Sequence, residues 1–270
     1  MNDTLLDRNY DFSAADEALD IIREKQIPLI ITTSKTRAQV EIYRARLNLD
    51  HPIIVENGSA VYFPKGSFPR GRLPAGCLAE GGEFIFPLAG TVDVILPDLR
   101  SAAGKVGAEI ELITEMPVDK IHELTGMPIE ECRLAKNRKY IMYFLCHSRR
   151  EELTDELRSR NLKITWGSYF MHLGDTGSKG MAVHKLTALY RGLGHYSVIT
   201  AGFGDNMNDK SMLENVTIPC LVERPGGGYA EGLDIEGLEK LKGVGPVGWN
   251  SGIIDLVKSI DWSIGEDFQQ

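Results

Sequence analysis

The apolar residues of the first 63 positions follow two patterns in turn. After Ser13, apolar side chains recur at helical spacing, which predicts an amphipathic helix with Ser13 as its cap and Asp16 in the capping-box position. Runs rich in β-branched residues, such as Pro28–Thr32, predict buried strands. The Asn57-Gly58 pair predicts a tight turn before the last strand of the group. The elements expected here are helices over 13–27 and 36–47 and strands over 28–32, 52–55 and 60–63.

The pattern changes between residues 82 and 166. Short apolar runs separated by two amphipathic stretches predict an antiparallel sheet with helices on one face, which is an α+β arrangement. Glycines and prolines gathered between residues 64 and 82 predict a linker into this part. The elements expected are strands near 84–87, 110–114, 139–145 and 163–166 and helices near 98–106 and 149–160.

Alternation of helices and strands returns after Gly180 and is typical of a parallel sheet with crossover helices. We therefore expect an α/β fold with a doubly wound, mostly parallel, Rossmann-like core. Residues 1–81 and 167–270 form this core domain in our interpretation, and residues 82–166 form an inserted α+β cap domain. The elements expected after Gly180 are helices over 181–190, 209–215 and 252–260 and strands over 197–201 and 218–222.

Composition narrows the class of protein. Of the 270 residues, 43% are apolar and 25% are charged, and no apolar run reaches the roughly 18 to 20 residues that span a bilayer. No secretory signal peptide is recognisable after Met1. The formal net charge of −8 argues against nucleic-acid partners, which select basic surfaces. The cysteines form no CxxC pair, which indicates neither a zinc site nor a disulfide framework and favours a cytoplasmic location.

The sharpest chemical candidate is Gly202–Asp209, which follows the strand predicted at 197–201. Ligands of open α/β sheets gather at the carboxyl ends of the strands. Two carboxylates there, Asp205 and Asp209, lie on a glycine-rich loop and suit a hard cation such as Mg²⁺. The alternative is a helix start whose Asp and Asn side chains cap the helix and complement its dipole.

Two further stretches carry the groups of an anion site. Thr33, Ser34 and Lys35 lie between a predicted strand and a predicted helix, so hydroxyls, free backbone N–H groups and an ammonium gather there. Lys179 lies between glycines ahead of another helix, where its charge can neutralise a phosphoryl group. The alternatives are a capping run of hydroxyl residues and a solvated surface lysine. Together with the paired carboxylates, these stretches supply the parts that phosphoryl transfer requires.

With these three stretches in this order along the chain, the sequence resembles the haloacid dehalogenase-like phosphatases. Within them it resembles the Cof-type subfamily IIB, in which an α+β cap is inserted late in the core. Thr33 matches the second motif of the family, Lys179 matches the third, and Gly204–Asp209 matches the fourth, GDxxND. The closest likeness is to a sugar-phosphate branch of that family. It is carried by Thr33–Thr36, Glu56-Asn57-Gly58 and Gly245–Asn250.

The resemblance implies a Mg²⁺-dependent phosphatase that acts through an aspartyl-phosphate on a small-molecule phosphosugar or sugar–glycerate phosphate. Thr33 and Lys179 are then expected to hold the phosphoryl oxygens, while Asp205 and Asp209 hold or orient the metal. In the cap, Lys136 and Arg138 are candidates for binding a glycerate carboxylate, and the alternative is a solvated basic edge. The remaining residues expected to bind substrate are Ser34, Lys35, Asn57, Gly58 and Asn208.

The first motif of the family, DxDGT, is incomplete in this chain. When Thr4 is aligned with its threonine, Asn2 takes the place of the acid/base Asp, Asp3 takes the place of the glycine, and the nucleophilic Asp falls one position before Met1. An amide cannot exchange a proton as a carboxylic acid does. We expect the natural chain to begin upstream, and we keep Asn2 and Asp3 as catalytic candidates. The alternatives are that a local shift has recruited Asp3 or that the protein binds a phosphosugar without catalysis.

The sequence is compatible with two other functions to different degrees. A phosphatase for another phosphosugar, such as sucrose phosphate, stays open because no cap residue decides between such substrates. A nucleotide-binding Rossmann domain is disfavoured because no GxGxxG follows an early strand.

Overall fold

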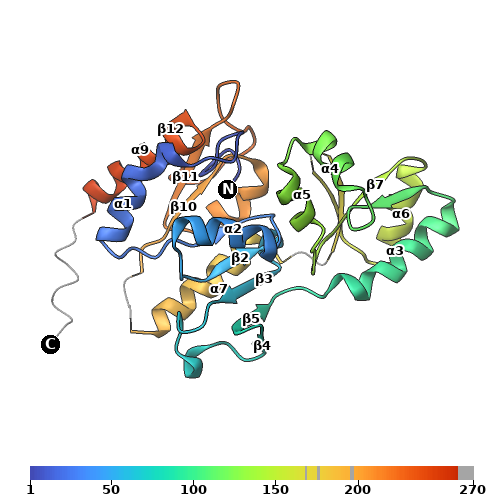
Figure 1. The fold of residues 1–270 in the computed structure, drawn as a ribbon, viewed down its shortest axis with the longest axis horizontal. Helices are drawn as coiled ribbons and strands as arrows, with labels where there is room; N and C mark the ends of the chain where they lie inside the picture. The colour runs from blue at the N-terminus through green and yellow to red at the C-terminus, as the bar shows by residue number, and fades with distance from the viewer. Residues whose placement is uncertain (168, 175–176, 195–197, 261–270) are drawn as a thin grey trace. The chain divides into compact units, whose positions relative to one another are not determined.

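The computed structural model describes residues 1–167, 169–174, 177–194 and 198–260 (Figure 1). The chain divides into two units, one of Met1–Leu29 with His195–Gln270 and one of Ile30–Gly194. No helix within the described ranges is long and apolar enough to cross a membrane.

The first unit contains a three-stranded parallel sheet in the order β10-β11-β12. Helix α9 packs on this sheet, and α1 packs on α9 (Figure 1). The Asn250 side chain ties the two helices together, because its Oδ1 accepts a hydrogen bond of 2.9 Å from the Ala18 N–H. The strands are β10 (Ala201–Gly204), β11 (Ile218–Glu223) and β12 (Glu239–Val244). The helices are α1 (Asp16–Glu24), α8 (Lys210–Leu213) and α9 (Pro246–Ser259), with 3-10 turns η1 (Ser13–Ala15) and η4 (Met207–Asp209).

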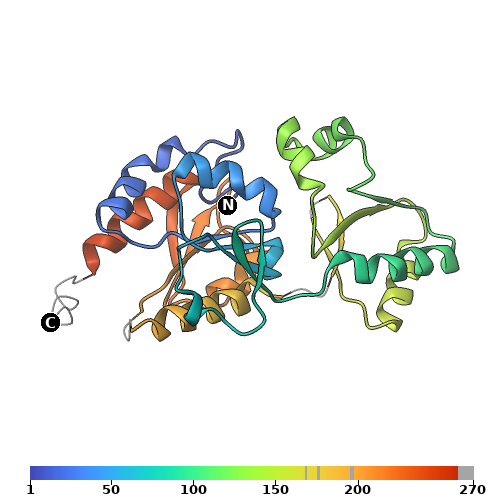
Figure 2. The same cartoon turned by 60° about the horizontal axis from the view of Figure 1, so that its bottom comes forward.

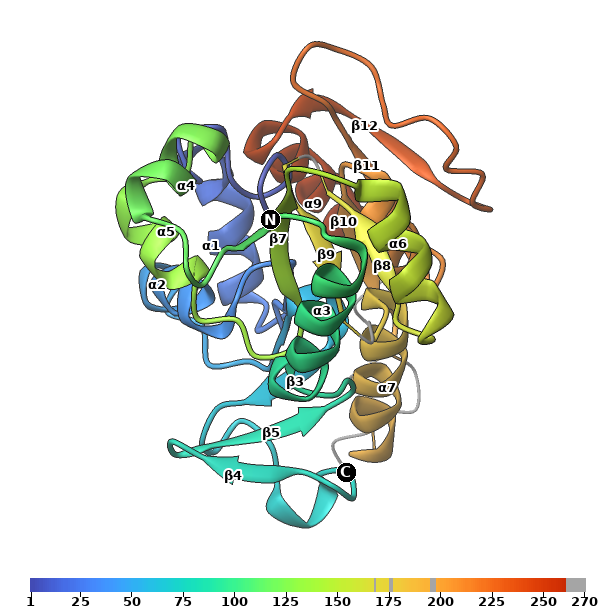
Figure 3. The same cartoon turned by 90° about the vertical axis from the view of Figure 1, so that its right-hand side faces the viewer.

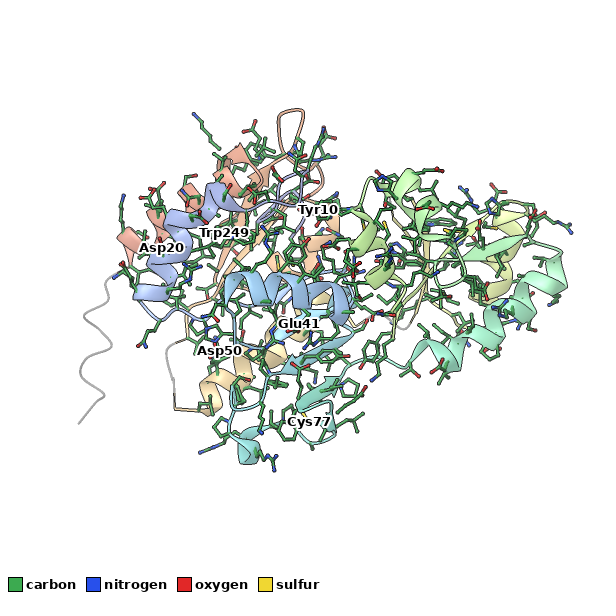
Figure 4. The ribbon with its side chains drawn as sticks, in the orientation of Figure 1. Tyr10, Asp20, Glu41, Asp50, Cys77 and Trp249 are labelled. Carbon is green, nitrogen blue, oxygen red and sulfur yellow. The ribbon has the colours of Figure 1, made fainter. Side chains whose placement is uncertain are left out.

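Trp249 anchors α9 to the sheet. Its side chain, labelled in Figure 4, is 4% exposed. Its ring centroid lies 5.9 Å from that of Phe203 in β10. The helix begins at Pro246 rather than at the expected Gly252, because a proline fits the first helical position, where no N–H is needed. The Gly245–Asn250 stretch, which carries part of the family likeness, therefore contains the start of a helix.

Ser13 does not cap α1, contrary to the expectation. It lies in η1, and both its backbone N–H and its hydroxyl donate to the Asp11 carboxylate. The residue at the N-cap of α1 is Ala15, which offers no side-chain acceptor.

The strand expected at 197–201 is displaced. The structure places β10 at Ala201–Gly204, and its parallel pairing with β11 begins at Ala201 opposite Ile218. Ile199, which the apolar pattern placed in the strand, is 54% exposed, while Ser197 lies outside the described residues. Part of the stretch interpreted as a loop, Gly202–Gly204, is thus the strand itself.

The second unit contains two sheets, of which the first has the order β1-β2-β3-β5-β4. The β1–β2 pair is parallel and the other pairs are antiparallel. Helix α7 packs on β2 and β3 (gold in Figure 2), where Ala182 and Leu186 are buried against Ile54, Val61 and Phe63. The strands are β1 (Ile31–Thr32), β2 (Ile53–Val55), β3 (Ala60–Phe63), β4 (Leu78–Glu80) and β5 (Glu83–Pro87). The helices are α2 (Arg37–Leu47) and α7 (Lys179–Gly192), with 3-10 turns η2 (Glu56–Gly58) and η3 (Arg70–Arg72).

Helix α2 forms as the sequence predicts. The Thr36 side chain accepts from the Gln39 N–H, and the Gln39 side chain accepts from the Thr36 N–H, which completes a capping box. Its apolar face, with Val40, Tyr43 and Leu47, is buried.

The second sheet of this unit is antiparallel, in the order β6-β7-β9-β8. Helices α3 and α6 lie side by side over it (Figure 3). Alternate residues of β7, Met142, Phe144 and Cys146, are buried in a hydrophobic core with these helices. The helices are α3 (Val92–Val106), α4 (Val118–Thr125), α5 (Ile129–Ala135) and α6 (Arg150–Ser159). The strands are β6 (Ile110–Leu112), β7 (Met142–Cys146), β8 (Ile164–Trp166) and β9 (Met171–Leu173).

These elements confirm the α/β fold class, with one correction to sheet membership. The strand predicted near 84–87 was grouped with the inserted sheet, yet β5 pairs with β3 across Ala60–Phe63. Its partner on the other side, β4, formed within the stretch expected as a linker. This first sheet therefore gains antiparallel strands that the alternation of helices and strands did not indicate. The proposed bounds of the core and cap domains stay a prediction.

Candidate active site

A pair of carboxylates follows β10 in the first unit. The Asp205 N–H donates a hydrogen bond of 3.1 Å to Asp209 Oδ2, which turns the Asp209 side chain back toward the end of the strand. The Thr4 hydroxyl donates to Asp205 Oδ1 at 2.8 Å, although the two residues are far apart in sequence. Asp209 is 6% exposed and Thr4 is 3% exposed. The loop thus holds two acidic groups in fixed positions at a strand end.

Gly204 makes room for this arrangement. A Cβ atom at position 204 would lie 2.5 Å from Asp209 Cβ and 2.8 Å from its Cγ, closer than side-chain atoms can approach. The first glycine of the GDxxND stretch is therefore required by the close approach of Asp209.

The two carboxylates destabilise each other's charge. Burial, followed by the neighbouring Asp209 charge, raises the pKa of Asp205, and the hydrogen bond from Thr4 opposes part of this rise. A bound cation would relieve the same repulsion, so two oxygen-donor side chains at the end of a strand fit a hard divalent ion such as Mg²⁺. Among the described residues, no group of three or more His, Cys, Asp or Glu side chains is arranged to hold a metal.

The residues that align with the incomplete first motif lie in the same unit. Asp3 has a φ of +54°, a left-handed conformation that glycine adopts most readily, which agrees with its alignment to the glycine of that motif. Asn2 is exposed, and its Nδ2 donates to the Tyr10 hydroxyl at 3.5 Å. Thr4 is a site residue that our sequence reasoning missed, although its alignment with the motif threonine was available as a signal.

Asn208, predicted to bind substrate, lies exposed in η4 between the two carboxylates of the pair.

The second unit positions Thr33 directly after β1. Its N–H donates to the Ile54 carbonyl at 3.0 Å, and its carbonyl accepts from the Asn57 N–H at 2.9 Å. Its Oγ1 accepts from the Lys35 N–H at 3.2 Å, and the residue is 3% exposed. Thr33 and Asn57, both predicted site residues, are therefore joined through their backbones.

Gly58 brings Lys179 to the same place. A Cβ atom at Gly58 would lie 2.6 Å from the Ser178 carbonyl carbon and 2.7 Å from the Lys179 nitrogen, and Gly58 has a φ of +92°. Lys179 is the first residue of α7 and is 4% exposed. The side-chain Oδ1 of the adjacent Asn57 is buried and has no hydrogen-bond partner among the residues that the structure describes. The structure thus brings Thr33, Asn57, Gly58 and Lys179 together.

Three basic side chains predicted to bind substrate contact protein groups in this structure. Lys35 Nζ lies 2.8 Å from Glu131 Oε2 in α5, and burial lowers the pKa of Lys35. Lys136 Nζ donates to the Met116 carbonyl at 2.7 Å. The Arg138 side chain is 2% exposed, so the alternative of a solvated basic edge is wrong for this residue. Its guanidinium donates to the carbonyl of Ser34, another predicted site residue, at 3.0 Å.

The predicted residues thus fall into two groups. Asn2, Asp3, Asp205, Asn208 and Asp209 belong to the first unit, and the others belong to the second. Their common action on one phosphoryl group stays a prediction.

The amino-acid sequence is similar to those of known proteins. The sequence profile of the family described as haloacid dehalogenase-like hydrolase matches residues 1–69. A glucosyl-3-phosphoglycerate/mannosyl-3-phosphoglycerate phosphatase of Methanococcoides burtonii is 34% identical over 265 residues, which cover 95% of each chain. A mannosyl-3-phosphoglycerate phosphatase of Pyrococcus furiosus is 30% identical over 213 residues, covering 79% of this chain and 85% of the relative.

Solved structures show the same fold at lower identity. A haloacid dehalogenase-like hydrolase from Bacteroides thetaiotaomicron aligns with a TM-score of 0.65 and 15% identity, covering 94% of this chain and 96% of that one. A sugar phosphatase of haloacid dehalogenase subclass IIB aligns with a TM-score of 0.58 and 18% identity, covering 94% of this chain and 95% of that one.

Proposed function

The chain belongs to the haloacid dehalogenase-like hydrolases, and we propose that it hydrolyses mannosyl-3-phosphoglycerate to mannosylglycerate and phosphate. It is a phosphatase, that is, a phosphoric monoester hydrolase. The observation that carries the proposal is the Asp205–Asp209 pair, in which the Thr4 hydroxyl donates to Asp205 and Gly204 leaves room for the Asp209 side chain. The chain that holds this pair matches a glucosyl-3-phosphoglycerate/mannosyl-3-phosphoglycerate phosphatase over 95% of both lengths.

In this proposal Asp205 and Asp209 hold Mg²⁺, which when bound supplies positive charge to the phosphoryl oxygens. Thr33 and Lys179 bind the same oxygens through a hydroxyl and an ammonium. The buried Asn57 Oδ1 has no partner within the described part of the chain, so a hydroxyl group of the substrate is a suitable donor for it. Core residues 1–81 and 167–270 carry these groups, and the cap of residues 82–166 selects the sugar part.

Glucosyl-3-phosphoglycerate is a second candidate substrate, because the relative from Methanococcoides burtonii is named for both compounds. The two compounds differ only in their neutral sugar and share the phosphoglycerate part. The protein groups that bind the phosphoryl oxygens can therefore bind both in the same way. We therefore expect turnover of both compounds, at rates that the cap decides.

A substrate panel tests the proposal. Release of inorganic phosphate is measured with Mg²⁺ from mannosyl-3-phosphoglycerate, glucosyl-3-phosphoglycerate and sucrose phosphate. We expect the highest kcat/KM for one of the two phosphoglycerates. Preference for sucrose phosphate would contradict the substrate assignment, and saturable binding by calorimetry without turnover would favour a phosphosugar-binding protein.

A further inference from the structure

One short segment of the second unit, Lys139–Ile141, lies where the chain passes between the two sheets. The connection from β5 to α3 reaches it through the Val92 N–H, which donates to the Lys139 carbonyl at 2.9 Å. The connection that leaves β9 touches it at Gly174, where a Cβ atom would lie 2.8 Å from the Tyr140 carbonyl oxygen and 3.2 Å from Ile141 Cα. Both connections between the sheets therefore pack on the same three residues.

The carboxylate of Glu56 binds this segment through its backbone. Oε1 accepts from the Lys139 N–H at 2.9 Å, and Oε2 accepts from the N–H groups of Tyr140 at 3.1 Å and Ile141 at 2.9 Å. The Glu56 side chain is 2% exposed, so these charge-assisted bonds form away from water. The bonds join η2, next to the first sheet, to the irregular segment that leads into β7 of the second sheet.

Arg138 completes this arrangement. Its Nε lies 3.7 Å from Glu56 Oε2 and donates to the Ile141 carbonyl at 2.6 Å. The same guanidinium donates to Ser34, next to Thr33. The carboxylate thus has both a nearby counter-charge and three N–H donors, which a buried charge needs in order to be tolerated.

The backbone of Glu56 faces the anion-binding residues. Its N–H donates to the Lys35 carbonyl at 3.0 Å, and its neighbours Asn57 and Gly58 contact Thr33 and Lys179. Its φ of +45° is unusual for a residue with a side chain, and this conformation turns the side chain and the backbone toward different parts of the unit. Glu56 therefore touches both the residues expected to hold the phosphoryl group and the connection to the sheet expected to select the sugar.

We propose that Glu56 is a positioning residue that fixes the second sheet, through Lys139–Ile141, relative to the loop of Thr33 and Lys179. The proposal rests on the proposed function for its effect on the substrate. Loss of the carboxylate loosens the segment that orients the cap, so it weakens binding of the sugar part while leaving the phosphoryl-binding groups in place.

Hydrogen exchange tests the structural part without any substrate. Glu56→Gln keeps the shape of the side chain but turns an N–H₂ group toward an N–H donor, so at least one of the three bonds is lost. We expect exchange of the Lys139, Tyr140 and Ile141 amides to become about tenfold faster or more, because each charged hydrogen bond contributes to their protection. In the wild type these amides should exchange far more slowly than amides of exposed loops.

A matched control removes another carboxylate that contacts the same segment. Glu80 Oε2 lies 2.6 Å from Lys139 Nζ, but this ion pair is exposed, with the Glu80 side chain 59% and the Lys139 side chain 37% accessible. Glu80→Gln should leave exchange at Lys139–Ile141 unchanged. Fast exchange of this segment in the wild type, or equal exchange in Glu56→Gln and wild type, would overturn the proposal, and the wild-type measurement holds even if the variant fails to fold.

Kinetics test the effect on the substrate. Glu56→Gln should raise KM for mannosyl-3-phosphoglycerate several-fold more than KM for p-nitrophenyl phosphate, which has no sugar, with a smaller change in kcat. Equal effects on both compounds would contradict the positioning role. A wild type that hydrolyses neither compound would refute the proposed function, and the exchange result alone then decides the role of Glu56.

Discussion

Gly58 and Gly204 each leave room for a group at the candidate site. Gly58 lets the backbone ahead of Lys179 come within contact of η2, and Gly204 lets the Asp209 side chain fold back over β10. In both places a side chain of any size would occupy space that another part of the site fills. At the scale of single residues, the geometry of the site thus depends on glycines as much as on charged groups.

Gly58→Ala should destabilise the protein more than the same change at Gly66. Gly66 has a similar φ, +86°, but a Cβ atom there would meet nothing within 4 Å. We expect about 1 kcal/mol of lost unfolding free energy at Gly66 from backbone strain alone, and about 2 kcal/mol more at Gly58 from the clash with residues 178 and 179. Urea denaturation measures both variants, and equal losses would show that the close approach is absent.

His172 should make the protein less stable in mild acid. Its ring stacks on Tyr143 with centroids 3.8 Å apart, and burial, followed by the Arg138 charge, lowers its pKa to about 3. Between this value and the unfolded pKa of about 6.5 the unfolded state binds more protons. Stability is therefore full above the unfolded pKa and falls as the pH drops through this window, by at most about 1.4 kcal/mol per pH unit.

His172→Phe removes this proton linkage and should flatten the decline in unfolding free energy between pH 6.5 and pH 3. The control is His122→Gln, because His122 is exposed in α4. Denaturant titrations at several pH values measure the effect. A wild-type slope retained in His172→Phe would contradict the assignment.

Some single residues were predictable from sequence and others were not. Asp205, Asp209, Thr33 and Lys179 lie in short stretches whose composition and order carry a chemical signal. Glu56 carried no such signal for its own role, because its carboxylate binds backbone groups more than 80 positions away, a contact that only the fold creates.

Two helices of the second unit, α2 and α5, are joined by a buried cluster. Glu131 of α5 accepts from Lys35 Nζ, from Gln39 Nε2 at 2.8 Å and from the Tyr43 hydroxyl. The Lys35 and Glu131 side chains are 6% and 5% exposed. At the scale of elements, this cluster fixes the helix that follows the Thr33 loop against one that covers the second sheet.

Removing one charge of this cluster should cost more than removing both. Lys35→Met leaves Glu131 buried without its cation, and we expect a loss of about 3 to 5 kcal/mol of unfolding free energy. The double variant Lys35→Met/Glu131→Gln should recover part of that loss, because no unpaired charge stays buried and the amide oxygen still offers an acceptor to the Gln39 and Tyr43 donors. Thermal or urea unfolding measures the cycle, and additive losses in the double variant would contradict a direct ion pair.

Several helices and strands could not be predicted from the sequence, for physical reasons. Helices α4 and α5 are short, so their apolar residues repeat too few times to show a helical pattern. Each also follows a proline at its N-cap, and a proline is typical of a loop. Strand β12 has largely exposed side chains and lies at the edge of its sheet, where no buried run marks it. Strand β10 contains two glycines, which usually weaken a strand, and the apolar run ahead of it attracted the prediction instead.

For the whole molecule, the order of motifs along the chain predicted the family, and relatives that span most of its length confirm it. The sequence could not give the pairing of β5 with β3, because a strand's partner depends on which edge is free in the fold. The sequence also could not show which basic side chains bind substrate and which stabilise the fold. Lys35 and Arg138 have the chemistry of both, and only their burial and partners show that each contacts the protein.

The proposed function requires the Asp205 carboxylate to hold the Mg²⁺ on which phosphatase activity depends. The most direct measurement is release of inorganic phosphate from mannosyl-3-phosphoglycerate by the wild type, by Asp205→Ala and by Asp255→Ala, with and without Mg²⁺. Asp255 is an exposed carboxylate on α9 of the same unit and serves as the control. We predict Mg²⁺-dependent release by the wild type and Asp255→Ala and only background release by Asp205→Ala; full activity in Asp205→Ala would show that Asp205 does not hold the metal.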